Sequence, residues 1–133
     1  MRILVVEPLK SPEVREIDGT LESMQQIVGG TIQAIYPFDD PVTIVVNDEG
    51  KLLGFPPNRG LRDDAGELYD IICGTFFMCG LTEENFGSMT EEQIKKFSKE
   101  YETPELFVRL NGELLALPLT PEEAEKWRRE YEG

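Results

Sequence analysis

Five polar residues between positions 47 and 70 have side chains suited to holding a small polar ligand. They are Asn47, Asn58, Arg59, Tyr69 and Asp70. Amides and carboxylates exchange hydrogen bonds, a guanidinium makes paired contacts, and a tyrosine ring stacks on planar groups. Proline and glycine flank Asn58 and Arg59 in the segment PPNRG, which predicts a stiff loop. We therefore predict a ligand-binding site here, without a catalytic residue, a metal or a cofactor.

The same residues also have a structural interpretation. Arg59 is a cation in an acidic chain, and Asp63 and Asp70 are near it in sequence. An ion pair with either aspartate would attach the loop to the strand that follows it. From the sequence alone, both interpretations remain open.

Acidic residues dominate the charge of the chain. There are 26 Asp and Glu against 13 Lys and Arg, which gives a formal net charge of −13. A field of this sign repels polyanions, so we expect no nucleic-acid partner. It attracts basic surfaces, so the second hypothesis is an inhibitor that covers the basic nucleic-acid-binding surface of a host protein. Several acids fall on the outer faces of predicted helices: Glu91, Glu92, Glu122, Glu125 and Glu132.

The residue inventory argues against most enzyme designs. The chain has no histidine, which removes the commonest general base and the Ser–His and Cys–His pairs. A carboxylate enzyme holding Mg²⁺ through Asp63, Asp64 or Asp70 is the least favoured hypothesis, because adjacent acids on loops are usually solvated. Cys73 and Cys79 lie in the apolar run IICGTFFMCG, and we expect both to be buried, unbonded core residues.

Apolar spacing, helix caps and turn residues predict the elements that position these residues. Together they indicate an α+β fold with a mostly antiparallel sheet and about three helices packed on it. Apolar residues at helical spacing, with N-terminal caps, predict helices over residues 20–28, 90–101 and 120–131. Asn111-Gly112 predicts a tight hairpin in the last third of the chain. Residues 42–47 and 51–55 are predicted to form another hairpin, and residues 56–66 an irregular loop. Gly29-Gly30, in IVGGTI, is interpreted as a helix end rather than a phosphate loop.

We expect one domain over residues 1–133. The 40% hydrophobic and 29% charged fractions are ordinary for a folded chain of 133 residues. No apolar run approaches the roughly 20 residues that span a bilayer, and the opening MRILVVEP is too short for a signal peptide. The sequence therefore predicts a cytoplasmic protein without membrane contact.

Three segments resemble a known family. The pattern N-x-x-G-K-L is matched by residues 47–52, N-R-x-L by residues 58–61, and Y-D-I-I-x-G-T by residues 69–75. With the segments before them, they resemble domain of unknown function 3846 over about residues 2–80, which leaves a helix–hairpin–helix extension over about residues 90–133. The resemblance implies a setting in bacteria, phages and plasmids. It implies no activity. Together with the polar residues described above, this setting leads to our first hypothesis, a non-catalytic binder that sequesters a nucleotide-like signal used by the host.

Overall fold

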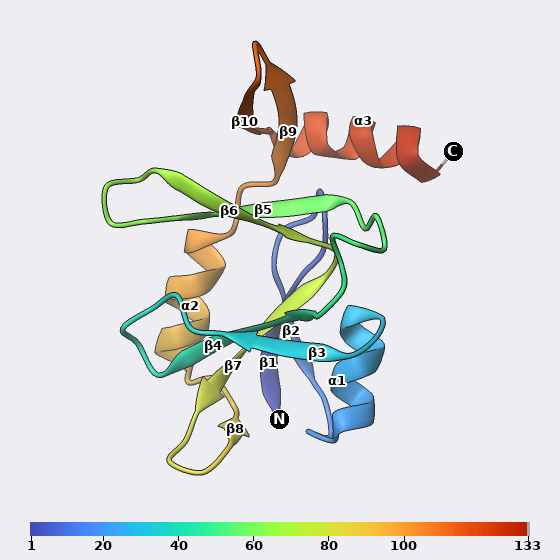
Figure 1. Cartoon of the computed structure of the whole chain (residues 1–133). Helices are drawn as coiled ribbons and strands as arrows, with labels where there is room; N and C mark the ends of the chain where they lie inside the picture. Colours follow the sequence, from blue (N-terminus) through green and yellow to red (C-terminus); the bar gives the residue numbers. More distant parts are fainter. Residues whose placement is uncertain (133) are drawn as a thin grey trace.

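The computed structural model describes residues 1–132, and side chains are described through residue 130. These described residues fold into ten strands and three helices (Figure 1). In chain order they are β1 (Arg2–Val6), β2 (Glu13–Glu16), α1 (Leu21–Val28), β3 (Ile32–Ile35), β4 (Val42–Asn47), β5 (Pro57–Arg62), β6 (Leu68–Cys73), β7 (Phe76–Leu81), β8 (Phe86–Gly87), α2 (Glu91–Glu100), β9 (Glu105–Leu110), β10 (Glu113–Pro118) and α3 (Pro121–Glu132).

The main sheet has the strand order β2-β1-β7-β4-β3, and β8 also pairs with β7. Every pairing in it is antiparallel. Its central strand β7, FFMCGL, is apolar on both faces and buried along most of its length. A strand of this composition needs cover on both sides.

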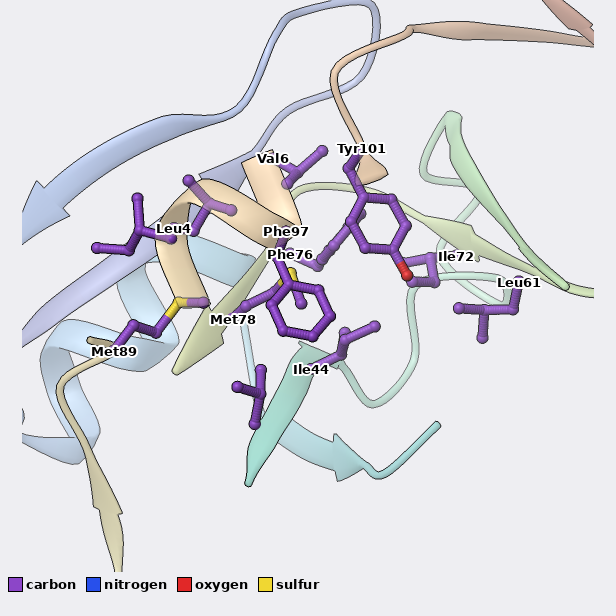
Figure 2. Close-up of a cluster of buried hydrophobic side chains, with 12 residues drawn as sticks. Leu4, Val6, Ile44, Leu61, Ile72, Phe76, Met78, Met89, Phe97 and Tyr101 are labelled. Atoms are coloured by element: carbon purple, nitrogen blue, oxygen red, sulfur yellow. The ribbon is translucent and has the colours of Figure 1, made fainter. Parts of the chain in front are cut away.

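Different elements cover the two faces of this sheet. On one face, α1 places Met24 and Val28 against Val5 and Phe77. On the other, α2 and the two-stranded β5–β6 sheet contribute to a larger cluster, in which Phe97 and Tyr101 meet Phe76 and Ile44 (Figure 2). The Tyr101 and Phe76 rings pack edge to face, with centroids 5.8 Å apart. Leu61 and Ile72, from β5 and β6, complete this cluster.

The third unit consists of the β9–β10 hairpin and α3, which lie beyond β5 and β6 in Figure 1. It is joined to the rest by a small apolar cluster of Leu9, Leu106, Leu119 and Ala124. Arg128 on α3 also donates a hydrogen bond to the carbonyl oxygen of Leu9. Thus α3 packs on the loop after β1 and on its own hairpin.

The structure confirms the predicted fold class and the three helices. Thr90 and Gln93 form the expected capping box of α2. Gly29 ends α1 with φ of 78°, and Asn111 and Gly112 both have positive φ in the two-residue loop of β9–β10. No helix in residues 1–132 is long and apolar enough to cross a membrane.

Two local predictions were wrong. Residues 51–55 form a turn rather than a strand, and residues 57–62 form β5, which pairs with β6, rather than an irregular loop. Apolar Leu52 and Leu53 suggested a strand, but their side chains are 87% and 55% exposed. Two polar side chains of β5, Asn58 and Arg59, are buried because they find partners in other segments.

Candidate functional site

Arg59 lies inside the molecule and is only 1% exposed. Its Nε and Nη2 donate to the carbonyl oxygen of Tyr101, at 3.2 and 3.0 Å, and Nη2 also donates to the carbonyl oxygen of Lys10 at 2.6 Å. Tyr101 is the C-terminal cap residue of α2, where a cation is favoured by the unpaired carbonyl groups. Burial lowers the pKa of Arg59 to about 10, and the charge of Glu105 partly opposes that shift.

Arg59 therefore makes its contacts within the protein, as the structural interpretation expected. Its partners, however, are not the two aspartates that the sequence suggested. Asp63 accepts hydrogen bonds from the backbone of Ala65 and Glu67 in its own turn. Asp70 pairs with Lys51. Carbonyl oxygens, rather than these two carboxylates, hold the guanidinium.

The two asparagines also connect segments of the backbone. Asn58 is fully buried, and its Nδ2 donates to the carbonyl oxygens of Val6 and Gly74, both at 2.9 Å. Asn47 donates to the carbonyl oxygen of Val28 at the end of α1 and accepts from the backbone N–H of Glu49. A buried amide with these partners fixes the approach of the segments it joins.

Asp70 and Tyr69 are the exposed members of the predicted set. They are neighbours on β6, so their side chains point to opposite faces of the strand. The ion pair between Asp70 and Lys51 attaches the turn after β4 to β6. Tyr69 is 58% exposed and borders a groove beside the β9–β10 hairpin. The five predicted residues thus do not converge on one point.

Two of them, Asn47 and Asp70, border a cavity of about 390 Å³. The cavity lies where β3 and β4, the turn after β4, and β6 come together. Its apolar wall consists of Ile35, Val46, Leu52, Leu61, Ile71 and Ile72. Ile35 and Val46 belong to the same sheet face as the Phe97 cluster, and both are only partly buried. The cavity is therefore a part of that face that α2 and β5–β6 leave incompletely covered.

The polar lining of the cavity is acidic on balance. Asp48, Glu49 and Asp70 contribute three carboxylates, against the single cation of Lys51. Gln33 adds an uncharged amide from β3. Carboxylates accept hydrogen bonds and attract positive charge, so this lining favours a ligand that donates hydrogen bonds.

The cavity lining includes one thiol, that of Cys73. Desolvation raises the pKa of its thiol above the ordinary value, so at neutral pH the group is protonated. The second cysteine, Cys79, is fully buried in the main sheet, where desolvation raises its pKa to about 12. The expectation that both cysteines are unbonded is confirmed, but Cys73 is only partly buried.

The acidic pairs do not assemble a metal centre in the described part of the chain. No group of three or more Cys, Asp or Glu side chains is arranged to hold a metal ion among residues 1–132. Asp63 is engaged in its turn, and Asp70 is engaged with Lys51. The Mg²⁺ hypothesis gains no geometric support from these contacts.

Sequence reasoning missed most of the cavity lining. Val46 and Ile71 are ordinary strand residues, and nothing in the run VTIVVN separates a core position from a cavity wall. Lys51 was the one detectable signal, since it is a cation in the family-like pattern at residues 47–52. The cavity depends on how the sheets meet, which sequence periodicity does not encode.

Comparison with known proteins identifies the family of this chain. Neither the curated proteins nor the solved structures include a match. A family model matches residues 1–102, which reaches past the segments noted in the sequence and includes α2. This match covers every strand of the main sheet, the β5–β6 sheet and the whole cavity lining. The chain therefore belongs to the family described as Domain of unknown function (DUF3846).

Proposed function

We propose that this protein is a non-catalytic binding protein that holds a small organic ligand in the cavity between β3–β4 and β6. The observation that carries the proposal is the cavity itself. Its volume of about 390 Å³ and its combination of an apolar wall with polar groups match the usual form of a small-molecule site. Binding without catalysis is supported by the thiol in the lining, Cys73, whose raised pKa makes it a poor nucleophile at neutral pH.

The lining also indicates the class of ligand. The lining suits an apolar body with hydrogen-bond donors on its edge, because Val46 and Ile71 are apolar and Asp48, Glu49 and Gln33 can accept hydrogen bonds. Nucleobases and nucleosides have this character. A phosphate group would meet three carboxylates and one lysine, so the nucleotide-like ligand expected from the sequence is here narrowed to a nucleoside-like one. Sequestration of such a molecule from a host process is the role proposed for this binding.

Thermal-shift measurements with matched nucleobases, nucleosides and nucleoside monophosphates test the proposal. A ligand present at 100 times its Kd stabilises the folded state by about 2.7 kcal/mol. We expect a nucleoside to raise Tm more than its monophosphate does. Calorimetry then measures the Kd of the best compound.

A variant pair locates the site. Val46→Phe places a ring in the cavity, and we expect it to abolish the ligand-induced rise in Tm. Val14→Phe is the matched control, because Val14 lies on edge strand β2 and is 42% exposed. Absence of a shift with every compound, or an equal shift in both variants, would contradict the proposal.

A second candidate is the acidic inhibitor of a basic host protein. The observation that favours it is the exposure of Glu91 and Glu92 on α2 and of Glu122 and Glu125 on α3, on two separate helices. The side chain of Glu132, which belongs to the same predicted set, lies outside the described side chains. The negative charge of these glutamates speeds association with a basic surface. It also makes binding of the basic partner sensitive to the salt concentration.

Pull-down from a host lysate at low and at moderate ionic strength tests this candidate. We expect a basic protein to be captured at low salt and lost when Glu122 and Glu125 are both changed to Lys. Capture that does not respond to salt or to this double substitution would contradict it. The matched control is the paired change of Glu83 and Glu84 to Lys, in the turn before β8.

A further inference from the structure

Strand β10 has the sequence of an interior strand but the position of an edge strand. Its central residues, LLAL at 114–117, are apolar on both faces, as in strands that have neighbours on both sides. Yet within residues 1–132 β10 pairs with β9 alone, and Leu114 and Leu117 are 38% and 42% exposed. An apolar strand with one free edge is a template for pairing with another chain.

The edge strand β2 of the main sheet shows the usual protection. Its sequence is EVRE, so charged side chains occupy most positions. Charges and prolines on an edge oppose unwanted pairing. In β10 these devices are confined to the ends, at Glu113 and Pro118, and leave the centre of the strand unprotected.

The local charge selects the kind of partner. The segment from residue 105 to residue 118 contains Glu105, Arg109 and Glu113, so its net charge is −1, within a chain of −13. A second copy of the chain is repelled by most of the surface and least by this hairpin. A basic partner is drawn instead to the acidic helices.

We propose that β10 pairs antiparallel with β10 of a second copy and joins the two hairpins into one continuous sheet. The positive-φ turn at Asn111 and Gly112 makes Leu110 and Glu113 the first hydrogen-bonded pair of the hairpin. Because bonding alternates along an antiparallel strand, Leu114 and Ala116 direct their N–H and C=O groups away from β9. These are the groups that a second copy would meet.

With a twofold axis through Leu115, the free N–H and C=O groups of Leu114 and Ala116 in one copy pair with those of the other copy. Leu114 of one copy then faces Ala116 of the other, and each of these residues donates and accepts one backbone hydrogen bond. Leu115 faces Leu115 of the second copy, and Glu113 faces Leu117. No like charges are opposed across the pair, which would otherwise be destabilising.

Sedimentation equilibrium of the full chain over a range of concentrations tests the proposal. We expect a dimer that dissociates on dilution. Leu114→Lys places a charge on the free edge and should weaken dimerisation about tenfold or more. Leu21→Lys is the control, because Leu21 is 57% exposed on α1, far from the hairpin (Figure 1), and this variant should dimerise as the unaltered chain does.

Disulfide trapping tests the register. In a Cys73→Ser background, Leu115→Cys should form a disulfide-linked dimer on mild oxidation, because directly opposed residues of a non-hydrogen-bonded pair have Cα atoms about 4.5 Å apart. Leu110→Cys, at a position that is 59% exposed on β9, should not. A monomer at every concentration overturns the proposal, as does a dimer that is unaffected by Leu114→Lys.

Discussion

Arg59 lies where three segments of the chain meet. Its guanidinium connects β5 to the end of α2, through Tyr101, and to the loop after β1, through Lys10. Each bond involves a charged donor and a carbonyl oxygen, a class stronger than a bond between neutral groups. At the residue scale, a side chain predicted to bind a ligand has its hydrogen-bonding capacity directed at the protein itself.

We predict that Arg59→Ala lowers the free energy of unfolding by about 2–4 kcal/mol, because it leaves buried carbonyl oxygens without donors. Urea denaturation measures this change. Arg109→Ala, at an exposed position on β9, is the matched control and should change stability by less than about 0.5 kcal/mol. Unchanged stability of Arg59→Ala, together with loss of the ligand-induced Tm shift, would instead assign Arg59 to the ligand.

Cys79 makes stability depend on pH in the alkaline range. Its pKa is raised from 9.0 to about 12 in the folded state. The stability that the buried, protonated thiol contributes to the folded state is therefore fully present below pH 9 and is lost as the pH rises towards 12. Desolvation also raises the pKa values of Cys73 and Tyr101, which act in the same direction above pH 9 and pH 10 respectively. Between about pH 10 and 12.5 the lowered pKa of Arg59 acts in the opposite direction.

We therefore predict that the free energy of unfolding falls by about 1 kcal/mol per pH unit just above pH 9, where Cys79 begins to ionise in the unfolded chain only. Urea denaturation at several pH values between 8 and 10 measures the slope. Cys79→Ala should make it shallower, whatever its effect on absolute stability. An equal slope in both proteins would show that another group is responsible.

At the scale of elements, Gly74 separates two strands that belong to different sheets. It has φ of 87° and lies between β6 and β7 in the apolar run IICGTFFMCG. A Cβ at this position would lie 2.7 Å from Cδ2 of Phe55, so any other residue there would have a strained backbone and would displace the Phe55 ring. The turn directs β6 towards β5 and β7 into the centre of the main sheet.

A comparison of Gly74→Ala with Gly66→Ala separates the cost of a positive φ from the cost of steric contact with Phe55. Gly66 has φ of 81°, but no atom lies within 4 Å of the point that a Cβ would occupy, so its substitution should cost only about 1 kcal/mol. We predict that Gly74→Ala costs about 1–3 kcal/mol more, because the Phe55 ring must move. Urea denaturation of both variants tests this, and equal losses would contradict a role for the ring.

At the scale of the whole molecule, the family match and the packing divide the chain at the same place. The match ends at residue 102, and both large apolar clusters consist of residues no later than Tyr101. The C-terminal unit adds the Leu9 cluster and Glu105, whose carboxylate accepts from the backbone N–H of Gly60 and pairs with Arg62. A core that is complete without the C-terminal unit should fold without it.

We predict that residues 1–102 alone form a folded monomer, less stable than the full chain by about 2–4 kcal/mol through loss of the Leu9 cluster and the Glu105 bonds. Urea denaturation and sedimentation measure stability and mass. If the proposed binding site is correct, this fragment also keeps the ligand-induced Tm shift while it loses dimerisation. An unfolded fragment would show that the C-terminal unit is needed for the fold.

The sequence by itself determined the features that depend on neighbouring residues. The three helices follow from apolar spacing and end caps, and the β9–β10 hairpin follows from Asn111-Gly112, because each depends on contacts within a few residues. The fold class could be predicted for the same reason. The exclusion of histidine-based chemistry required only the composition.

Tertiary structure alone decided what the polar residues do. The segment PPNRGL has weak strand character, yet it forms β5 because β6 and distant carbonyl groups satisfy Asn58 and Arg59. Conversely, Leu52 and Leu53 remain in an exposed turn. The cavity exists because α2 and β5–β6 leave Ile35 and Val46 partly uncovered, a consequence of how separate sheets and helices meet. Long-range packing of this kind is not encoded in local pattern, so only Asn47 and Asp70 of the candidate site could be predicted from the sequence, and the rest emerged from the folded chain.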